Sequence, residues 1–528
     1  MNRTAFDAIV IGGGHNGLVN AAYLARAGLK VLVLERRRLV GGAAVTEEVF
    51  PGFKYCVCSY VVSLLRPEII RDLDLPACGL EILPLESTFT PLPSGDYLVR
   101  WADHDLTRRE LYRHSPRDAD AYDEFGHLMH QLAFAVKPVL GMMPPDLTSF
   151  APSDLAGLLR LGRYVRGLGA DRFHALVKLM TMSAAEYLEE WFETEALRAT
   201  MSASGIIGTF LGPRSPGTAY VLLHHYMGEI DGVFRAWGFA RGGTGAVSNA
   251  IATAAERRGV TIRTGAPVAR VLTRGGRARG VVLESGEEIA AKVVVSALDP
   301  KRTFLELVDP ASLPGELIED IRRFRIRGSS GKVNLALSEL PSFTCLPGIG
   351  PHLRGAMSIS PSVEYLERAY DDAKYGAFSR RPYMDIVIPS LIDPGMAPPG
   401  KHVMSIFVQY APYRLNGGWT DARREAFGDT VIDTLSQYAP NLRGAILHRQ
   451  VLTPADMERE MGLTEGNIFH GELSLHQLFS LRPAAPWAQY RTPIAGYYQC
   501  GSGTHPGGGI SGAPGRLGAL RILKDLGR

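Results

Sequence analysis

Hydrophobic periodicity divides the first 35 residues into a strand, a helix and a second strand. Residues 6–11 read FDAIVI, a short apolar run with β-branched character that predicts a buried strand. Residues 18–30, LVNAAYLARAGLK, carry apolar side chains at helical spacing, and residues 31–35, VLVLE, predict another strand. This order is typical of a β-α-β unit in a parallel sheet, so we expect an α/β fold.

The middle of the chain, from about residue 106 to residue 226, has mostly helical periodicity. Ser115 and Ser183 begin sequences of capping-box form, complete or nearly so, before periodic segments. One predicted helix, residues 155–169 (LAGLLRLGRYVRGLG), sets Arg160, Arg163 and Arg166 beside a leucine-rich face. We favour a surface helix packed on the core, while the pattern also fits a helix that lies on a membrane surface.

Extended patterns occupy the later part of the chain. Residues 268–300 alternate like a β-meander and end in a long apolar strand that contains VVVSA. Three segments between residues 331 and 410, KVNLALS, MDIVIPS and HVMSIFVQY, predict strands of a second sheet, and Thr420 begins a helix over 421–438. A short strand at 497–500 leads through glycines into a terminal helix from about Ala513 to Leu526.

Composition adds a few constraints. The 528 residues are too many for one compact core, and the hydrophobic (46%) and charged (21%) fractions are ordinary for a globular protein. A net charge of +3 with interspersed signs gives no reason to expect nucleic acid. The five cysteines have neither C-x-x-C nor metal-ligand spacing. The first strand leaves no room for a targeting segment and no apolar run could span a membrane, so we expect a cytoplasmic protein, with peripheral membrane contact left open.

A glycine motif lies between the first strand and the helix. Residues 12–17, GGGHNG, satisfy G-x-G-x-x-G, and Glu35 follows at the end of the second strand. Gly12 permits the tight turn, Gly14 lets the backbone approach a pyrophosphate, and Gly17 lets the helix pack closely. The helix N-terminus offers N–H groups to the phosphates, and Glu35 can accept hydrogen bonds from the adenosine ribose. The residues predicted to bind a dinucleotide here are Gly12, Gly14, His15, Asn16, Gly17 and Glu35.

The residues after Glu35 indicate which dinucleotide binds. Arg37 completes an E-x-R pattern, and a glycine pair follows at Gly41 and Gly42, next to Ala43. This extension resembles flavoproteins of the glutathione-reductase-like superfamily, especially the amine oxidase and phytoene desaturase branches. The resemblance implies FAD, with the glycine pair lying against the pyrophosphate and ribityl region.

The glycine-rich segment 496–518, GYYQCGSGTHPGGGISGAPGRLG, is predicted to contact the same cofactor. Residues 507–512 also satisfy G-x-G-x-x-G, but they do not follow their strand directly, and no second strand or ribose acid comes after them. We therefore interpret the segment as a flavin strap, whose N–H groups face the ring edge that gains negative charge on reduction. The strap residues assigned to the cofactor are Gly501, Ser502, Gly509 and Ile510.

The cofactor-binding segments are far apart in the sequence, so the domains are predicted to be discontinuous. In this superfamily the central meander lies beside the adenine, with a backbone contact from its first strand, which is here Val268. We expect a Rossmann-like FAD-binding domain of glutathione-reductase type from residues 1–75, 237–305 and 485–528. A β-sheet substrate domain would comprise residues 76–105 and 306–484, and a helical cap residues 106–236.

Long segments extend the resemblance to the phytoene desaturase-like flavoproteins over nearly the whole chain. Among them are PGFKYCVCSYVVSLLRPEI, WGFARGGTGAVSNA, GNIFHGELSLHQLFSLRP and CGSGTHPGGGISGAPGR. The resemblance implies FAD, a two-lobed fold, and hydride or electron transfer. Our leading hypothesis is hydride transfer between flavin N5 and a hydrophobic substrate, with isoprenoids and carotenoids among the candidates. It fixes neither the substrate nor the electron acceptor nor the oligomeric state.

Three histidines are the candidates for chemistry beside the flavin. His505, in the predicted strap, is the first candidate, and His470, in GNIFHGELS, is the second. His225 directly follows His224, so that at most one of the two is expected to face a cavity. Each of these residues has an alternative role as a buried structural histidine.

Two alternative functions stay open. An amine-oxidase-like enzyme would use the same cofactor scaffold, usually with an aromatic pair beside the flavin, for which Trp487 and Tyr490 are the nearest candidates. A flavin-bound protein that binds or regulates a partner, with little turnover, is the other. Release of hydrogen peroxide on amine addition would favour the first, and a tight complex with a flavin that no acceptor reoxidises would favour the second.

Overall fold

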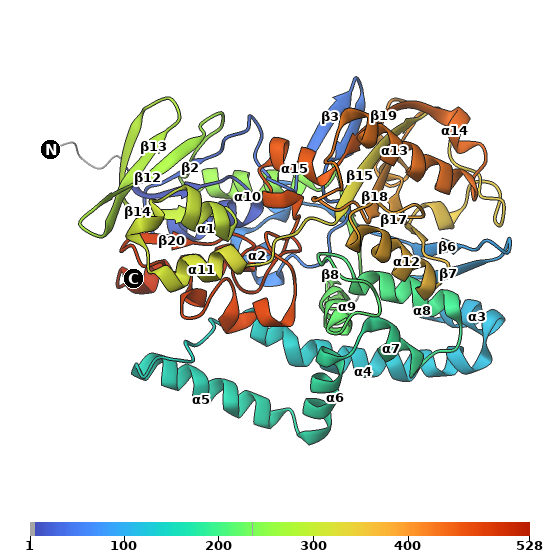
Figure 1. Ribbon diagram of the computed structural model, residues 1–528, viewed down its shortest axis with the longest axis horizontal. Helices are drawn as coiled ribbons and strands as arrows, with labels where there is room; N and C mark the ends of the chain where they lie inside the picture. Colours follow the sequence, from blue (N-terminus) through green and yellow to red (C-terminus); the bar gives the residue numbers. More distant parts are fainter. Residues whose placement is uncertain (1–5, 235) are drawn as a thin grey trace.

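The protein has two lobes, each built on a seven-stranded sheet, with a layer of helices along one side (Figure 1). The structure, a computed structural model, describes residues 6–234 and 236–528. The first sheet and its helices form one lobe, and the second sheet forms the other beside it (Figure 1). The expected α/β fold with a Rossmann-like domain and a sheet-based second domain is confirmed.

The first lobe is a mostly parallel sheet in the order β11-β2-β1-β14-β13-β12, with β20 also paired to β14. β1, β2, β11, β14 and β20 run parallel, whereas β12, β13 and β14 form the predicted antiparallel meander. The strands are β1 (Phe6–Ile11), β2 (Val31–Leu34), β11 (Thr261–Arg263), β12 (Val268–Arg274), β13 (Arg277–Leu283), β14 (Glu288–Ser296) and β20 (Tyr497–Gln499).

Both faces of this sheet are covered, which explains why its central strands are apolar at every position. Ala8 and Val10 of β1 pack with α1 (His15–Arg26), α10 (Gly245–Glu256) and α16 (Ala513–Asp525). Ile9 and Ile11 point the other way, into a cluster that includes α11 (Gly315–Arg323). Successive side chains of a strand alternate between faces, so one run of residues serves two cores.

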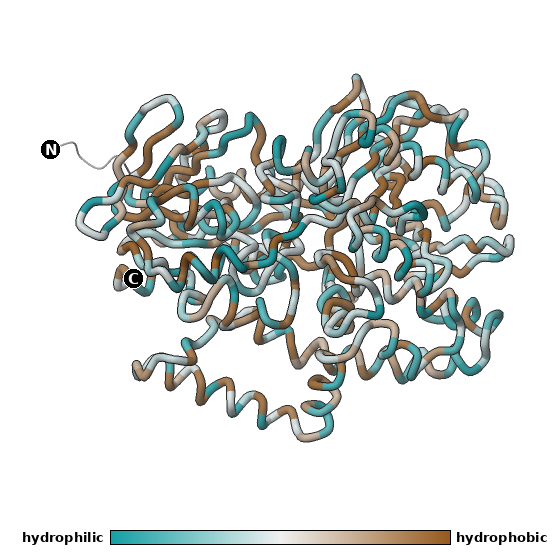
Figure 2. The backbone as a smooth tube through the Cα atoms, viewed as in Figure 1, coloured by the Kyte–Doolittle hydropathy of each residue, from teal (hydrophilic) through white to brown (hydrophobic). Residues whose placement is uncertain are grey.

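The second lobe is a mixed sheet in the order β19-β15-β18-β17-β16-β6-β7. Val333, Leu335 and Leu337 of β15 pack against α13 (Asp421–Ser436), whose first turn is capped by Thr420 as predicted. The apolar positions of both sheets stand out as brown segments in Figure 2. The strands are β6 (Ser87–Pro91), β7 (Tyr97–Trp101), β15 (Ser330–Leu337), β16 (Ala356–Ile359), β17 (Tyr383–Val387), β18 (His402–Gln409) and β19 (Ile446–Leu452).

The helical layer comes from the segment with helical periodicity, and both predicted caps are present. The Ser115 hydroxyl accepts a hydrogen bond from the Asp118 N–H at 3.2 Å, and Ser183 forms a complete capping box with Glu186. The helices are α3 (His104–His114), α4 (Pro116–Leu140), α5 (Pro152–Gly167), α6 (Ala170–Thr181), α7 (Ala184–Glu189), α8 (Glu195–Ser202) and α9 (Thr218–Tyr226).

The basic helix α5 is held only loosely to the rest of the protein (Figures 1 and 2). None of its residues, all of which the structure describes, is buried, and Leu155 and Leu159 are 43% and 64% exposed. Its inner face is half-buried, and the Tyr164 hydroxyl donates to the Ala135 carbonyl of α4 at 2.8 Å. It is a surface helix, but the expected packing on the core is only partial. No helix in the described part of the chain is long and apolar enough to cross a membrane.

Each lobe draws its strands from distant parts of the chain. The first sheet uses residues 6–34, 261–296 and 497–499, and the second uses 87–101 and 330–452. These stretches fall within the predicted discontinuous domains, whose boundaries stay predictions. The remaining elements are β3 (Thr46–Phe50), β4 (Phe53–Cys56), β5 (Ile82–Pro84), β8 (Glu229–Ile230), β9 (Val233–Phe234), β10 (Gly238–Ala240), α2 (Pro67–Leu73), α12 (Val363–Lys374), α14 (Leu442–Ala445) and α15 (Pro454–Met461).

Candidate functional site

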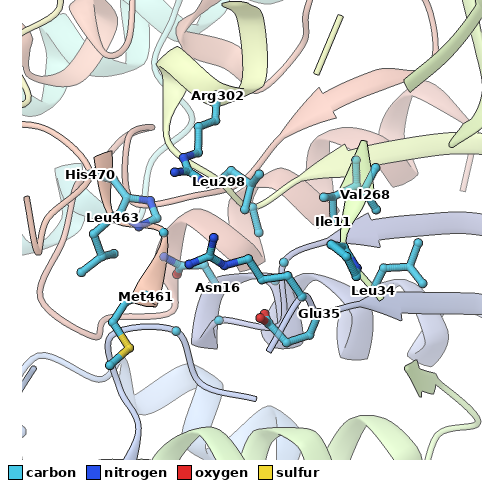
Figure 3. A pocket seen from close by; sticks show the side chains of 18 of the residues that line it. Ile11, Asn16, Leu34, Glu35, Val268, Leu298, Arg302, Met461, Leu463 and His470 are labelled. Carbon is cyan, nitrogen blue, oxygen red and sulfur yellow. The ribbon is translucent and has the colours of Figure 1, made fainter. Parts of the chain in front are cut away.

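A cavity of about 440 Å³ lies at the carboxyl ends of β1 and β2, next to the N-terminus of α1 (Figure 3). We call it the nucleotide cavity. Ligands of parallel α/β sheets bind at this edge, because the turns after the strands and the helix N-termini meet there. Its lining includes Ile11, Gly12, Gly14, His15, Asn16, Gly17, Leu34, Glu35, Gly42, Ala43, Val268, Arg302, Leu463, Ile468, His470 and Ser502.

Each of the three fingerprint positions is a glycine for a different physical reason. Gly12 has a φ of +97°, which favours glycine. A Cβ on Gly17 would lie 2.1 Å from the Gly12 carbonyl oxygen, so this position needs glycine for packing. A Cβ on Gly14 would meet no atom of the described residues within 4 Å, and Gly14 lines the cavity. Gly14 therefore keeps space free for a ligand rather than for the protein.

The glycine pair predicted to lie along the cofactor does flank the fingerprint loop. The Gly41 N–H donates to the Gly13 carbonyl oxygen at 2.9 Å, and a Cβ on Gly42 would lie 3.4 Å from the Gly14 Cα. Gly41 has a φ of +126°, and a Cβ there would lie 2.4 Å from the Ala44 carbonyl oxygen. The chain can therefore run close beside the fingerprint only because Gly41 and Gly42 have no side chains.

Glu35 is oriented by two backbone N–H groups. Its Oε2 accepts from Gly13 N–H and its Oε1 from Arg37 N–H, both at 2.8 Å. Each carboxylate oxygen keeps a lone pair with which a ribose hydroxyl can bond. Figure 3 shows the carboxylate at the edge of the nucleotide cavity.

Arg37 contributes its backbone rather than its side chain. Its guanidinium forms an ion pair with Glu47 at 2.8 Å and is not among the described groups that line the cavity. Arg36 lines the cavity instead, and its guanidinium donates to two carbonyl oxygens at the end of α15, those of Arg459 and Glu460. The E-x-R spacing alone does not reveal which arginine turns toward the ligand.

The strap segment contributes one of its four predicted residues to the cavity wall. Ser502 lines the cavity, and its Oγ accepts from Asn16 Nδ2 at 2.9 Å. Gly501, Gly509 and Ile510 are not among the described lining residues. A Cβ on Gly501 would lie 2.4 Å from the Leu298 carbonyl oxygen, and one on Gly509 would lie 2.7 Å from Leu64, so both glycines are needed for chain packing. Their contact with the cofactor stays a prediction.

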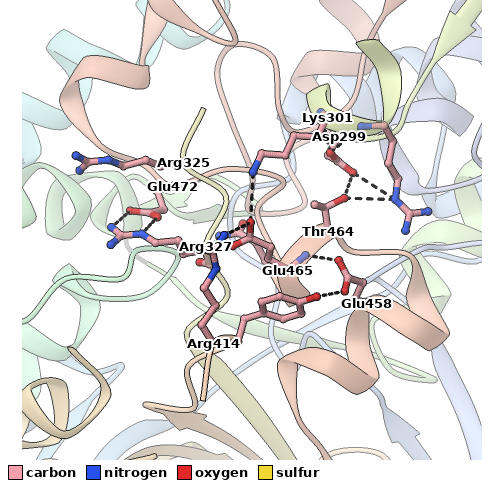
Figure 4. Close-up of polar contacts among 12 residues, drawn as sticks. Asp299, Lys301, Arg325, Arg327, Arg414, Glu458, Thr464, Glu465 and Glu472 are labelled. Carbon is pink, nitrogen blue, oxygen red and sulfur yellow. Dashed lines mark hydrogen bonds and ion pairs between the residues drawn. The ribbon is translucent and has the colours of Figure 1, made fainter. Parts of the chain in front are cut away.

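The far end of the cavity is closed by residues 461–470, which a polar network fixes in place (Figure 4). Thr464 Oγ1 donates to Asp299 Oδ2 at 2.7 Å, which ties the segment to the first lobe. Glu465 forms an ion pair with Lys301 at 3.3 Å. Glu472, two residues beyond this segment, is buried and accepts two hydrogen bonds from Arg327 at 2.7 and 2.9 Å, which tie the following chain to the second lobe. Because ion pairs and hydrogen bonds hold this segment to both lobes, the far wall of the nucleotide cavity has a fixed position.

Two histidines lie in this cavity. His470 lines it with a φ of +55°, and its Nδ1 is buried with no hydrogen-bond partner among the described residues. Burial lowers the pKa of His470. Burial, and to a lesser degree His470, also lower the pKa of His15 to about 4. Both imidazoles are therefore neutral at pH 7 unless an anion enters the cavity.

The other two candidate histidines lie elsewhere. His225 Nδ1–H donates to the Val221 carbonyl oxygen at 2.9 Å, and burial lowers its pKa to about 4. It lines a different cavity, described below. His505 Nε2–H donates to the Val139 carbonyl oxygen at 3.1 Å, and His505 is not among the described residues that line either cavity. The three histidines are thus in three separate environments, and the role predicted for each is untested.

A second cavity, of about 370 Å³, lies between the second sheet and the helical layer. We call it the second cavity. Most of its wall is apolar or aromatic, and one side carries Arg100 and Asp385. Its lining includes Tyr60, Arg100, Thr200, Ser204, Ile207, Leu222, His225, Tyr226, Phe234, Trp237, Ser358, Tyr383 and Asp385.

One apolar residue of each cavity belongs to the same hydrophobic clusters. Ile207 lines the second cavity and Ile468 lines the nucleotide cavity. Both pack in the same cluster as Tyr60, and both also pack against the cluster of Val221 and Phe469. Apolar side chains therefore connect the walls of the two cavities.

Sequence reasoning missed the second cavity and much of the far wall of the first. Tyr60 and Asp385, which line the second cavity, come from different segments, and neither belongs to a binding motif. A nearby signal is Lys332, which begins the segment KVNLALS, every residue of which is buried except the last. A lysine in a fully buried strand is rare and marks a functional position more often than an exposed one.

The fold and the glycine-lined nucleotide cavity, taken together with the family match, define a flavin-containing oxidoreductase. The chain belongs to the family described as flavin containing amine oxidoreductase, which matches residues 88–514. An NAD(P)-binding Rossmann-like domain matches residues 10–73. The flavin-containing family implies FAD, and the expected resemblance is confirmed.

Individual relatives cover nearly the whole chain. Pyridine nucleotide-disulfide oxidoreductase domain-containing protein 2 of Rattus norvegicus is 41% identical over 99% of this chain and 94% of its own. A phytoene desaturase (lycopene-forming) of a Paracoccus species is 26% identical over 99% of this chain and 98% of its own. Wild-type putrescine oxidase bound to putrescine has the same fold, with a TM-score of 0.61, 16% identity and 99% coverage of each chain.

The name of the rat relative mentions a disulfide, and the cysteines of this chain do not match that name. Each of its five cysteines, all in the described part of the chain, is free. Burial raises the pKa of Cys58 to about 12, so this thiol is unreactive near neutral pH.

Proposed function

We propose that the protein is an FAD-dependent oxidoreductase that transfers hydride between flavin N5 and a hydrophobic small molecule held in the second cavity. The observation that carries the proposal is that Ile207 of the second cavity and Ile468 of the nucleotide cavity pack in the same two hydrophobic clusters. When bound, the flavin supplies the hydride chemistry, and the protein supplies binding, orientation and exclusion of water.

Residues of the nucleotide cavity fit FAD. Glu35 is fixed by two N–H donors and offers acceptors to the ribose. Gly14 leaves open space at the N-terminus of α1, where N–H groups and the helix dipole favour a pyrophosphate. Because Glu35 fixes the adenosine end, the end lined by Leu463, Ile468 and His470 is left for the isoalloxazine ring.

The far end of the nucleotide cavity also supports the proposal. His470 has an unpaired, buried Nδ1 beside the space assigned to the ring, so it can bond to the flavin or to a substrate oxygen. We now place His470 ahead of His505 as the first candidate for a polar role, and His225, in the second cavity, as the next. His505 is kept as a third candidate, acting through the strap.

Anaerobic flavin reduction tests the proposal. Purified, FAD-loaded protein would be mixed with carotenoid, isoprenoid, fatty and amine compounds while the visible spectrum is recorded. We expect one hydrophobic class to bleach the flavin, and we expect Ile207→Trp to abolish bleaching while FAD stays bound. Bleaching that is unchanged in Ile207→Trp would contradict substrate binding in the second cavity.

An amine-oxidase-like reaction is the second candidate, because the matching family is described by that activity. The aromatic pair suggested for it does not support it. Trp487 packs in the core of the first lobe, the buried Tyr490 donates its hydroxyl to the His505 carbonyl oxygen at 2.6 Å, and neither is among the described residues of the second cavity. Hydrogen peroxide release on amine addition would favour this candidate. A flavin that no compound reduces, in a protein with a tight partner, would favour a regulatory role.

A further inference from the structure

We propose that Arg482 is a positioning residue for the flavin, which fixes two parts of the nucleotide-cavity wall and sets a buried positive charge behind them that favours the reduced, negatively charged ring. The inference rests on the proposed function, because it takes FAD to bind in the nucleotide cavity with its ring at the end lined by His470. It is drawn from the contacts of Arg482 with the chain around His470 and Ser502.

Arg482 is fully buried, and its hydrogen bonds in the described structure all go to backbone carbonyl oxygens, at 2.9 to 3.4 Å. A guanidinium group has five N–H donors in one plane, so it can hold several carbonyl groups at once. The acceptors are the carbonyl oxygens of Phe469, Gly471, Glu472, Gln477 and Ser502. One side chain therefore joins the segment 469–477 to the strap segment.

The acceptors of Arg482 lie directly behind the wall of the nucleotide cavity. Phe469 and Gly471 flank His470, which lines the cavity, and Ser502 lines it as well. The Nη2 group of Arg482 donates to the Gly471 carbonyl oxygen at 3.1 Å and to that of Ser502 at 2.9 Å. Because these two parts of the wall come from separate segments, Arg482 fixes the position of one relative to the other.

No carboxylate in the described part of the chain neutralises Arg482, since its hydrogen bonds all go to uncharged carbonyl groups. Burial lowers the pKa of Arg482 to about 10, so the side chain is still charged at pH 7. Tyr220 acts in the opposite sense, but burial raises the pKa of that phenol to about 12, so it is neutral at pH 7. Arg482 is therefore a buried positive charge that only carbonyl dipoles stabilise.

The charge of Arg482 acts on the end of the cavity assigned to the flavin ring. Burial is the main cause that lowers the pKa of His470, and the positive charge of Arg482 lowers it further. Arg302 acts in the same sense, but it is paired with Asp299 at 3.8 Å, whereas Arg482 has no such partner among the described residues. An electric field that disfavours a proton on His470 favours a negative charge at the same place.

Hydride transfer creates such a negative charge. A hydride brings two electrons and one proton to the neutral oxidised ring, so the reduced ring carries one negative charge. A fixed positive charge behind the wall stabilises the reduced form more than the oxidised form, and it needs no rearrangement when the charge appears. The buried position of Arg482 strengthens this effect, because water does not screen the charge.

Arg482→Gln tests the charge, because glutamine is neutral but keeps N–H donors for the carbonyl groups. The midpoint potential of the bound flavin would be measured anaerobically at pH 6 against reference dyes. We expect the equilibrium between reduced and oxidised flavin to shift at least about tenfold toward the oxidised form, which is about 30 mV to lower potential for a two-electron couple. An unchanged potential in the folded, FAD-loaded variant would overturn the inference.

Arg482→Lys separates the charge from the position. Lysine keeps a positive charge but donates from a single nitrogen, so it cannot hold the same set of carbonyl groups. We expect its redox equilibrium to stay within about threefold of the wild type, while its FAD affinity falls at least about threefold. A potential as low as that of Arg482→Gln would overturn the role assigned to the charge.

Arg521→Met is the matched control. This arginine of α16 is also buried, but it pairs with Asp525 at 3.7 Å and is not among the described residues that line the nucleotide cavity. We expect it to leave the flavin potential unchanged, and a shift equal to that of Arg482→Gln would overturn the inference. If Arg482→Gln does not fold, the wild-type protein serves: its flavin potential should lie above that of free FAD, and a lower one would overturn the inference.

The outcomes separate this inference from the proposed function. Bound FAD whose potential does not depend on Arg482 would overturn this inference alone. A potential that depends on Arg482, in a protein whose flavin no hydrophobic compound reduces, would uphold the inference and contradict the proposed substrate.

Discussion

The nucleotide cavity and the second cavity are similar in volume but are built in different ways. The first is shaped largely by backbone, with glycines at strand ends and one oriented carboxylate, Glu35. The second is shaped by side chains from the second sheet, from α9 and from loops far apart in sequence. A site formed by local backbone geometry therefore leaves a motif in the sequence, whereas a site formed by converging side chains does not.

The largest effect should come from Gly14→Leu. A Cβ there meets no atom of residues 6–234 and 236–528 within 4 Å, so the leucine would enter the nucleotide cavity and occupy the place of a pyrophosphate. We expect FAD affinity to fall by more than about 100-fold with the fold intact, measured by fluorescence titration and circular dichroism. Full yellow colour in the purified variant would show that the fingerprint does not bind the cofactor.

Gly17→Leu is the contrasting variant at the same motif. Its Cβ would lie 2.1 Å from the Gly12 carbonyl oxygen, so we expect loss of folding stability rather than selective loss of FAD. A variant with a normal melting temperature and no cofactor would reverse the roles assigned to these two glycines.

Glu35→Ala should have the next largest effect. It removes the predicted ribose acceptor and leaves the Gly13 and Arg37 N–H groups without their partner, at about 1–3 kcal/mol for each buried group. We expect FAD affinity to fall about 10- to 100-fold by titration. Glu48→Ala, whose carboxylate bonds only to the exposed Gly52 N–H in the described structure, is the control and should bind FAD normally.

The smallest effect concerns the two arginines after Glu35. Arg36 lines the nucleotide cavity and Arg37 pairs with Glu47, so Arg36→Ala should weaken FAD binding a few-fold and Arg37→Ala less. Titration of both variants under one condition gives the ranking. The reverse order would mean that the sequence pattern E-x-R identifies the ligand-facing arginine after all.

The sequence predicted those parts of the protein that local rules determine. The β-α-β unit, the meander, the cap at Ser183 and the helix after Thr420 all follow from periodicity and capping chemistry within a few residues. Glu35 and Gly42 could be assigned to the nucleotide cavity because their distance from the fingerprint is short and fixed by the fold.

The parts that depend on tertiary packing could not be predicted in the same way. His505 was the first candidate for chemistry, but the fold turns its ring toward the end of α4. The choice between Arg36 and Arg37 depends on α15, more than 400 residues away, whose carbonyl groups hold Arg36. Lys332 and Asp385 meet Tyr60 only when the second sheet has formed.

The most direct test is the amount of FAD bound per chain in the purified wild-type protein, measured from the visible spectrum and by release of the flavin on denaturation. The arrangement of Gly14, Glu35 and α1 predicts one FAD per chain, either retained through purification or taken up on addition of FAD. A folded protein that neither retains nor takes up FAD would contradict the assignment of the nucleotide cavity and, with it, the proposed function.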